Sequence, residues 1–175
     1  MSLEEFHRNF RSDLQATIAE RVEAGEGPFP SEELVFAEMV MEHVAEAGIS
    51  DSPTVCHWSG KVGNAKLRIT GFSQSSDETA LDLFVTHYFG TEELNELRDS
   101  DAAATASEGV RFLFRAASGT LEARIDPTHQ VRDLVATIRS RWGHIDRLRV
   151  FVITDGRTKT KRFSSKEVQH KMVTI

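Results

Sequence analysis

The side chains that could hold a metal ion lie on or near two consecutive apolar runs. Residues 66–72 (KLRITGF) and 80–89 (ALDLFVTHYF) have the length and the β-branched and aromatic content of strands. Asp82 and His87 lie on the second run, and Glu38 lies on an earlier helical segment. Hydrolysis of a phosphodiester with Mg²⁺ needs clustered carboxylates, and a histidine beside the metal can carry a proton. These three residues are therefore the candidates for a metal-dependent nuclease site.

Their spacing does not favour a regular site. Asp82 and His87 are five residues apart, so on a regular strand they face opposite sides, and a shared site needs a β-bulge. Glu38 and Glu42 equally fit a solvated polar stripe of their helix. His87 alternates with aliphatic residues, so it equally fits a hydrogen-bonded core histidine.

Periodicity and turn signals predict an α/β fold around these residues. Ser2 and Glu5 match a capping box before an amphipathic helix, and Ser31 and Thr91 are expected N-caps. The weak helix formers near 100–109 favour a bend or break in the third helix. Helices are expected over residues 2–24, 31–48, 91–118 and 127–143, and strands over 54–60, 66–72, 80–89 and 147–154, with a short extended segment at 121–125.

The last residues, KMVTI (171–175), begin an apolar alternation and stop. We expect residues 1–175 to form a single nuclease-like domain that is the N-terminal fragment of a longer chain. A natural edge strand at the C-terminus is the alternative.

Charge is divided unevenly along the chain, whose net charge is −6. Residues 1–108 carry 7 basic and 21 acidic side chains, whereas residues 109–175 carry 14 basic and 6 acidic ones. A basic C-terminal half can bind phosphates, although the two halves can also neutralise each other in the fold. The candidate nucleic-acid contacts are Arg157, Lys159, Lys161, Arg162 and Lys166. A solvated loop or a contact with a missing C-terminal region is the alternative.

Composition narrows the class of protein. The hydrophobic content of 39% is ordinary for a soluble protein, and no apolar run has the length of a membrane span. Cys56 is the single cysteine, so an internal disulfide is excluded, and the chain begins without a signal-peptide pattern. We expect a cytoplasmic protein. Cys56-His57 lacks the paired spacing of a zinc site, so no metal ligand is assigned.

The order of elements and several phrases resemble one family. Helix, three strands, helix and strand follow one another, which is the αβββαβ order of the restriction-endonuclease-like proteins. The phrases LRITGF, LDLFVTHYF and RLRVFVITDG, together with an opening amphipathic helix and a helix ending RFL, resemble the N-terminal domain of bacterial abortive infection phage resistance (AIPR) proteins. The resemblance implies a central mixed sheet of about four to five strands flanked by helices, with an extra N-terminal helix.

The resemblance also implies where a nuclease site would lie. Family members that keep the site end one strand in Asp-Gly and carry Glu/Gln-x-Lys on the next. Here the matching positions are Thr70-Gly71 and Val85-Thr86-His87. Threonine is a poor sole substitute for a carboxylate on Mg²⁺, and valine ligates nothing. The resemblance therefore implies a degenerate site, and we lean toward a protein that is not an enzyme.

Three functions remain open from the sequence. The first is a non-catalytic nuclease-like domain for phage defence, without a cofactor, that binds nucleic acid, another protein or the C-terminal region of the same polypeptide. The second is an active nuclease that uses Mg²⁺ and relocated ligands. The third is an oligomerisation module in which the first helix forms a homodimer.

Overall fold

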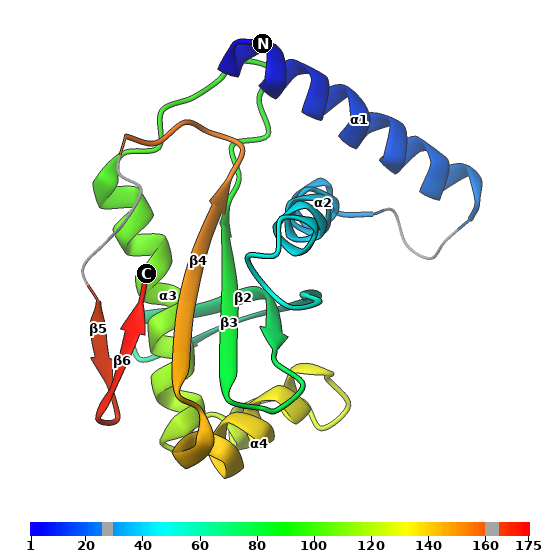
Figure 1. Cartoon of the computed structure of the whole chain (residues 1–175). Coiled ribbons are helices and arrows are strands. Elements are labelled where there is room, and N and C mark those ends of the chain that lie inside the picture. The colour runs from blue at the N-terminus through cyan, green and yellow to red at the C-terminus, as the bar shows by residue number, and fades with distance from the viewer. Residues whose placement is uncertain (26–29, 160–164) are drawn as a thin grey trace.

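A mixed sheet of six strands curls between helices in the computed structural model, which describes residues 1–25, 30–159 and 165–175 (Figure 1). The strands are β1 (Thr54–Val62), β2 (Ala65–Gln74), β3 (Ala80–His87), β4 (Arg147–Thr154), β5 (Lys166–Val168) and β6 (Lys171–Thr174). The α-helices are α1 (Leu3–Glu23), α2 (Glu32–Glu46), α3 (Asp99–Ala117) and α4 (Val131–Arg141), with short 3₁₀ helices at Glu122–Arg124 and Trp142–His144. The predicted α/β class is confirmed.

The sheet has the order β1-β2-β3-β4-β6-β5. Strands β1, β2 and β3 pair antiparallel, whereas β4 pairs parallel with both β3 and β6. The expected strands are confirmed, and β1 is longer than expected. Strand β5 was not expected, because it has three residues and its turn to β6 uses Gln169 and His170 at positive φ rather than glycine. The sheet therefore exceeds the expected four to five strands.

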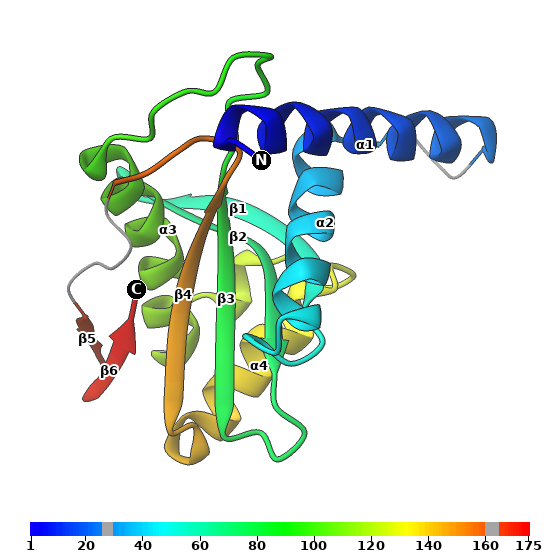
Figure 2. The same cartoon turned by 45° about the horizontal axis from the view of Figure 1, so that its top comes forward.

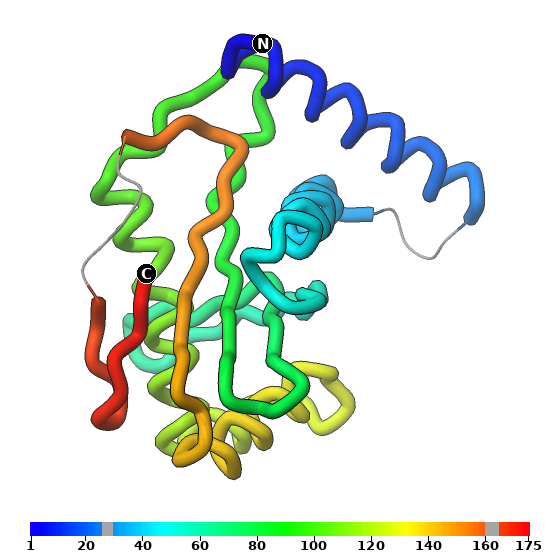
Figure 3. Tube along the Cα trace, in the orientation of Figure 1, coloured from blue at the N-terminus to red at the C-terminus, as the bar shows by residue number. Residues whose placement is uncertain are grey.

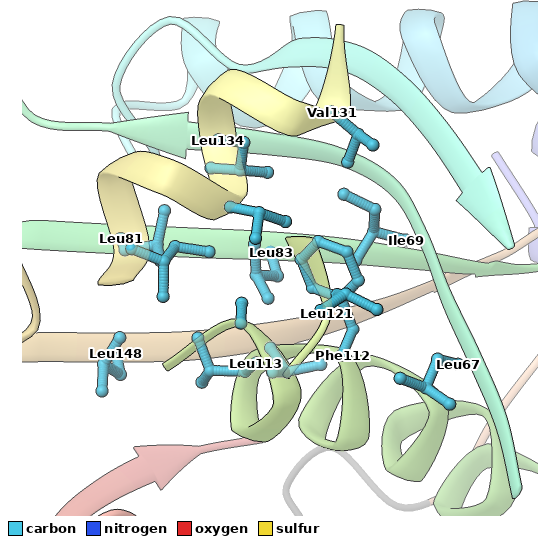
Figure 4. Packing of buried hydrophobic residues seen from close by; sticks show 14 of the residues in the cluster. Leu67, Ile69, Leu81, Leu83, Phe112, Leu113, Leu121, Val131, Leu134 and Leu148 are labelled. Atoms are coloured by element: carbon cyan, nitrogen blue, oxygen red, sulfur yellow. The ribbon is translucent and has the colours of Figure 1, made fainter. Parts of the chain in front are cut away.

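Both faces of the sheet are covered. Helices α3 and α4 cover one face, which forms the largest core cluster (Figure 4). Helix α2 covers the other face, where Ala37 and Met41 pack against Phe84 of β3. Helix α1 lies across the end of the sheet to which the carboxyl ends of β3 and β4 point (Figure 2). Strand β3 is buried from Ala80 to Thr86 because helices pack on both sides of it.

The first helix begins as predicted. Ser2 Oγ accepts a hydrogen bond from Glu5 N at 3.1 Å, and Glu5 Oε2 accepts one from Ser2 N at 2.7 Å. This reciprocal pair is the expected capping box. Ser31 is the N-cap residue of α2, although its side chain makes no capping hydrogen bond.

The prediction for residues 91–118 was wrong at its start and in its middle. The helix begins at Asp99, because residues 91–98 run beside the segment after β4, where Leu97 N donates to Arg157 O at 2.8 Å (Figure 3). The expected bend or break is also wrong, because α3 is one continuous helix. Its small residues, including Ala102, Ala106 and Gly109, are buried against the sheet and let the helix approach closely.

The prediction around residues 121–143 needs two corrections. The segment expected to be extended forms a 3₁₀ turn over Glu122–Arg124. Pro127 does not begin a helix, because Asp126 Oδ1 accepts hydrogen bonds from Thr128 N and Oγ1 and forms a local turn. Helix α4 therefore starts at Val131 and ends at Arg141.

Gly109 fixes the distance between α3 and the sheet, and we expect Gly109→Ala to destabilise the fold. A Cβ there would lie 2.6 Å from Val85 Cγ2 and 3.1 Å from Val150 Cγ1. Overpacking costs about 1–3 kcal/mol, which exceeds the helix-propensity gain of about 1 kcal/mol. Urea unfolding should show a lower free energy of unfolding for Gly109→Ala than for wild type.

The matched control is Ser107→Ala, whose hydroxyl bonds only to Ala103 O of its own helix. Adding Val85→Ala to Gly109→Ala should cost less than the sum of the two single changes. Equal or higher stability of Gly109→Ala would show that the helix can shift away from the sheet.

Candidate functional site

Asp82, the candidate metal ligand on β3, is fully engaged by a neighbouring strand. It is directly opposite Arg149 in the parallel β3–β4 register. Arg149 Nε and Nη2 donate to Asp82 Oδ1 and Oδ2, both at 2.7 Å, and Ser50 Oγ donates to Oδ2 at 2.5 Å. The Asp82 side chain is 3% exposed. Both carboxylate oxygens of Asp82 therefore already have donors, a bidentate guanidinium and a hydroxyl.

The degenerate positions from the family resemblance lie on both faces of the sheet. Thr70 and Thr86 are buried and share one face, where Thr86 Oγ1 donates to Thr70 Oγ1 at 3.0 Å. Val85 lies on the other face, in the core cluster with α3. The Thr70 hydroxyl, at the position where the resemblance expects a carboxylate, therefore accepts hydrogen bonds from both Thr86 N and Thr86 Oγ1.

Glu38 does not meet the other candidates. Its carboxylate forms an ion pair with Arg21 of α1, with Oε2 2.6 Å from Nη2, and Asp82 instead pairs with Arg149 on β4. His87 Nδ1 lies 3.1 Å from Thr105 Oγ1 of α3. The structure does not bring Glu38, Asp82 and His87 together.

His87 borders a polar pocket of about 370 Å³ at the carboxyl end of β3. Arg68 of β2 forms the centre of this pocket. Its Nε donates to Glu108 Oε2 of α3 at 2.7 Å, and its Nη1 donates to Glu33 Oε1 of α2 at 3.1 Å. Nη2 donates to the Thr86 carbonyl oxygen at 2.6 Å. One guanidinium thus joins the helices on both faces to the sheet and pairs with two of the pocket carboxylates, Glu33 and Glu108.

Neither Arg68 nor Arg149 was singled out from the sequence. The signal was an arginine inside an apolar strand, in KLRITGF and in RLRVFVIT, because a cation placed there needs a buried acidic partner. In the described part of the chain, no group of three or more His, Cys, Asp or Glu side chains has the geometry to hold a metal ion.

The single cysteine is buried on β1. Burial raises the pKa of the Cys56 thiol to about 11. The thiol is therefore protonated at neutral pH and cannot act as a nucleophile there. Burial also lowers the pKa of neighbouring His57.

An apolar groove of about 370 Å³ is lined by α1, α2 and the segment at the carboxyl end of β4. Phe10, Leu14, Phe36 and Val40 line it. Phe6, also part of its lining, remains 48% exposed. The groove leaves the N-terminal part of α1 with an incompletely covered apolar stripe.

The candidate basic segment is only partly described. Arg157 and Lys159 both pair with Glu96, at 3.6 and 3.0 Å. Lys166 lies exposed on β5, and Lys161 and Arg162 fall outside the described residues. Two of the five candidate cations therefore already have an acidic partner.

A comparison with protein-family models matched residues 36–175 to the abortive infection phage resistance protein N-terminal domain. The chain belongs to this family. Neither a comparison with curated proteins nor one with solved structures gave a match. The AIPR match includes the whole sheet, α3, α4 and most of α2, and it associates the domain with abortive infection.

Helix α1 of this AIPR domain precedes the matched region. No helix within residues 1–25, 30–159 and 165–175 combines the length and apolar character needed to cross a membrane.

Arg68→Met should strongly destabilise the domain. Arg68 and Glu108 side chains are only 14% and 16% exposed, so the change leaves buried carboxylate charge without its guanidinium. Loss of one partner of a buried ion pair costs about 3–5 kcal/mol. Urea unfolding should therefore show a lower free energy of unfolding than in wild type.

Arg98→Met is the matched control, because Arg98 also pairs with an acid but is 75% exposed. It should leave the unfolding midpoint essentially unchanged. Equal effects of the two substitutions would contradict a structural role for the Arg68 pairs.

Proposed function

We propose that this AIPR domain is a non-catalytic nucleic-acid-binding module of a phage-defence protein. Two carboxylates near the strands of the expected nuclease site pair with arginines, Asp82 with Arg149 and Glu33 with Arg68. This arrangement supports a domain that acts by binding rather than by hydrolysis.

The observation that carries the binding proposal is a set of uncompensated cations on one surface. Arg111 and Arg115 of α3 are four residues apart, so they lie on the same side of the helix. Strand β5, which carries Lys166, contacts this helix. In the described part of the chain, none of these three cations has a carboxylate within ion-pair distance. Cations of this kind can contact phosphates and release counterions.

Arg111→Gln with Arg115→Gln should weaken nucleic-acid binding. Fluorescence anisotropy with a labelled single strand and a labelled duplex, each at two salt concentrations, measures the change. The slope of log binding constant against log salt concentration should become shallower by about 0.7 for each phosphate contact that single-strand binding loses. The double variant should therefore have a slope shallower by about 1.4 than wild type. Wild type should leave both probes uncleaved in Mg²⁺ or Mn²⁺.

Arg8→Gln is the matched control, because Arg8 is an exposed arginine of α1 with no ion pair among the described residues. It should bind like wild type. Absence of binding by wild type, or metal-dependent cleavage, would overturn the proposed function.

Self-association through α1 is a second candidate function. It is favoured by Leu3 and Phe6, which are 52% and 48% exposed beside the apolar groove. The apolar stripe of α1 from a second copy has the chemistry to fill this groove.

Under this second candidate, wild type should form a concentration-dependent dimer that Phe6→Glu dissociates. Light scattering after size-exclusion chromatography measures the mass directly. A wild-type monomer at every concentration would exclude self-association through α1.

A further inference from the structure

A hollow of about 320 Å³ lies between α3, the start of β2 and β5. We call it the α3–β5 hollow. Leu67, Val110 and Val168 form its apolar wall, and Phe114 and two arginines stand around it. Figures 1 and 2 show β5 next to α3, and both elements lie on the side of the sheet away from α2. The hollow is therefore separate from the pocket of Arg68 and from the groove of α1.

Phe114 is the unusual side chain of this hollow. It is 42% exposed, although other phenylalanines of the domain, such as Phe84 and Phe112, are buried completely. The guanidinium carbon of Arg115 lies 5.8 Å from its ring centroid. An exposed ring beside an arginine provides a flat apolar surface next to positive charge.

The charges around the hollow favour an anionic ligand. Arg111 donates one hydrogen bond, to the Lys66 carbonyl oxygen at 3.3 Å, and keeps its charge without an acidic partner among the described residues. Glu167 is the one carboxylate of the lining, and it lies 3.8 Å from His170 Nδ1. Among the described lining residues, two guanidiniums thus accompany one carboxylate, and the balance is positive.

We propose that the α3–β5 hollow holds a base of single-stranded nucleic acid, with the base against Phe114 and the flanking phosphates on Arg111 and Arg115. This inference rests on the proposed nucleic-acid-binding function and specifies its ligand. A duplex keeps its base faces stacked inside the helix, whereas a single strand can place one against an aromatic side chain. In a single strand every base has a phosphate on each side along the backbone. Two cations beside one aromatic ring can therefore contact the two phosphates that flank the stacked base.

Phe114→Ala tests the base contact. The probes are a fluorescein-labelled single strand of about twelve deoxythymidines and a duplex of equal length. Phe114→Ala should lower affinity for the single strand about tenfold, because loss of one base–aromatic stacking contact costs about this factor in affinity. Duplex affinity should stay unchanged, because the bases of a duplex stack inside the helix. Val22→Ala, which removes another half-exposed apolar side chain and lies on α1 outside the groove lining, is the control and should bind like wild type.

Phe114→Trp keeps an aromatic surface and supplies a second readout. It should retain binding, and the single strand should quench the added tryptophan fluorescence relative to wild type. The quenching reports contact at residue 114 even if Phe114→Ala proves less stable in thermal melting.

The outcomes separate this inference from the function on which it rests. Wild type that binds neither probe removes both proposals. A second outcome would remove the base contact and keep the proposed function. In that outcome the double variant Arg111→Gln with Arg115→Gln binds more weakly, Phe114→Ala binds like wild type, and the single strand does not quench Phe114→Trp. Equal tenfold losses for single strand and duplex would also contradict base stacking.

Discussion

The bidentate ion pair between Asp82 and Arg149 joins two adjacent parallel strands in the middle of the sheet. Its geometry aligns β3 with β4, because two parallel hydrogen bonds form only when the two side chains are opposite each other. The same contact pairs the buried carboxylate of β3 with a positive charge from the neighbouring strand, as a buried charge requires.

Arg68 plays the corresponding part at the carboxyl end of β3. Its three hydrogen bonds reach α2, α3 and the β3 backbone, so the two layers of helices meet around one side chain. The pocket there is polar, and its carboxylates Glu33, Glu108 and Asp101 each have a basic partner. Arg111 and Arg115, which have no carboxylate within ion-pair distance among the described residues, lie on α3 beside Phe114. The region of the expected nuclease site and the surface that we propose to bind phosphate are therefore different parts of the domain.

The elements with strong local signals could be predicted from the sequence. The capping box of Ser2 and Glu5, the helical stripe of α1 and the apolar run of β4 each depend on nearby residues. The start of α3 could not be predicted, because Leu97 pairs with Arg157, sixty residues away. Among the site residues, Asp82 could be located on its strand, but its pairing with Arg149 depends on sheet order. The AIPR family prediction is confirmed, whereas the restriction-endonuclease-like relationship stays a prediction.

The position of α1 has a consequence for comparing members of the family. This helix and the first residues of α2 precede the matched region, yet Leu14 and Ile18 pack onto Val35 and Phe36 of α2. A homologue without such a helix has to shield the equivalent apolar surface with other atoms or replace it with polar side chains. Substitutions on α1 and on the outer side of α2 should therefore covary between lineages, while the sheet beneath them stays constant.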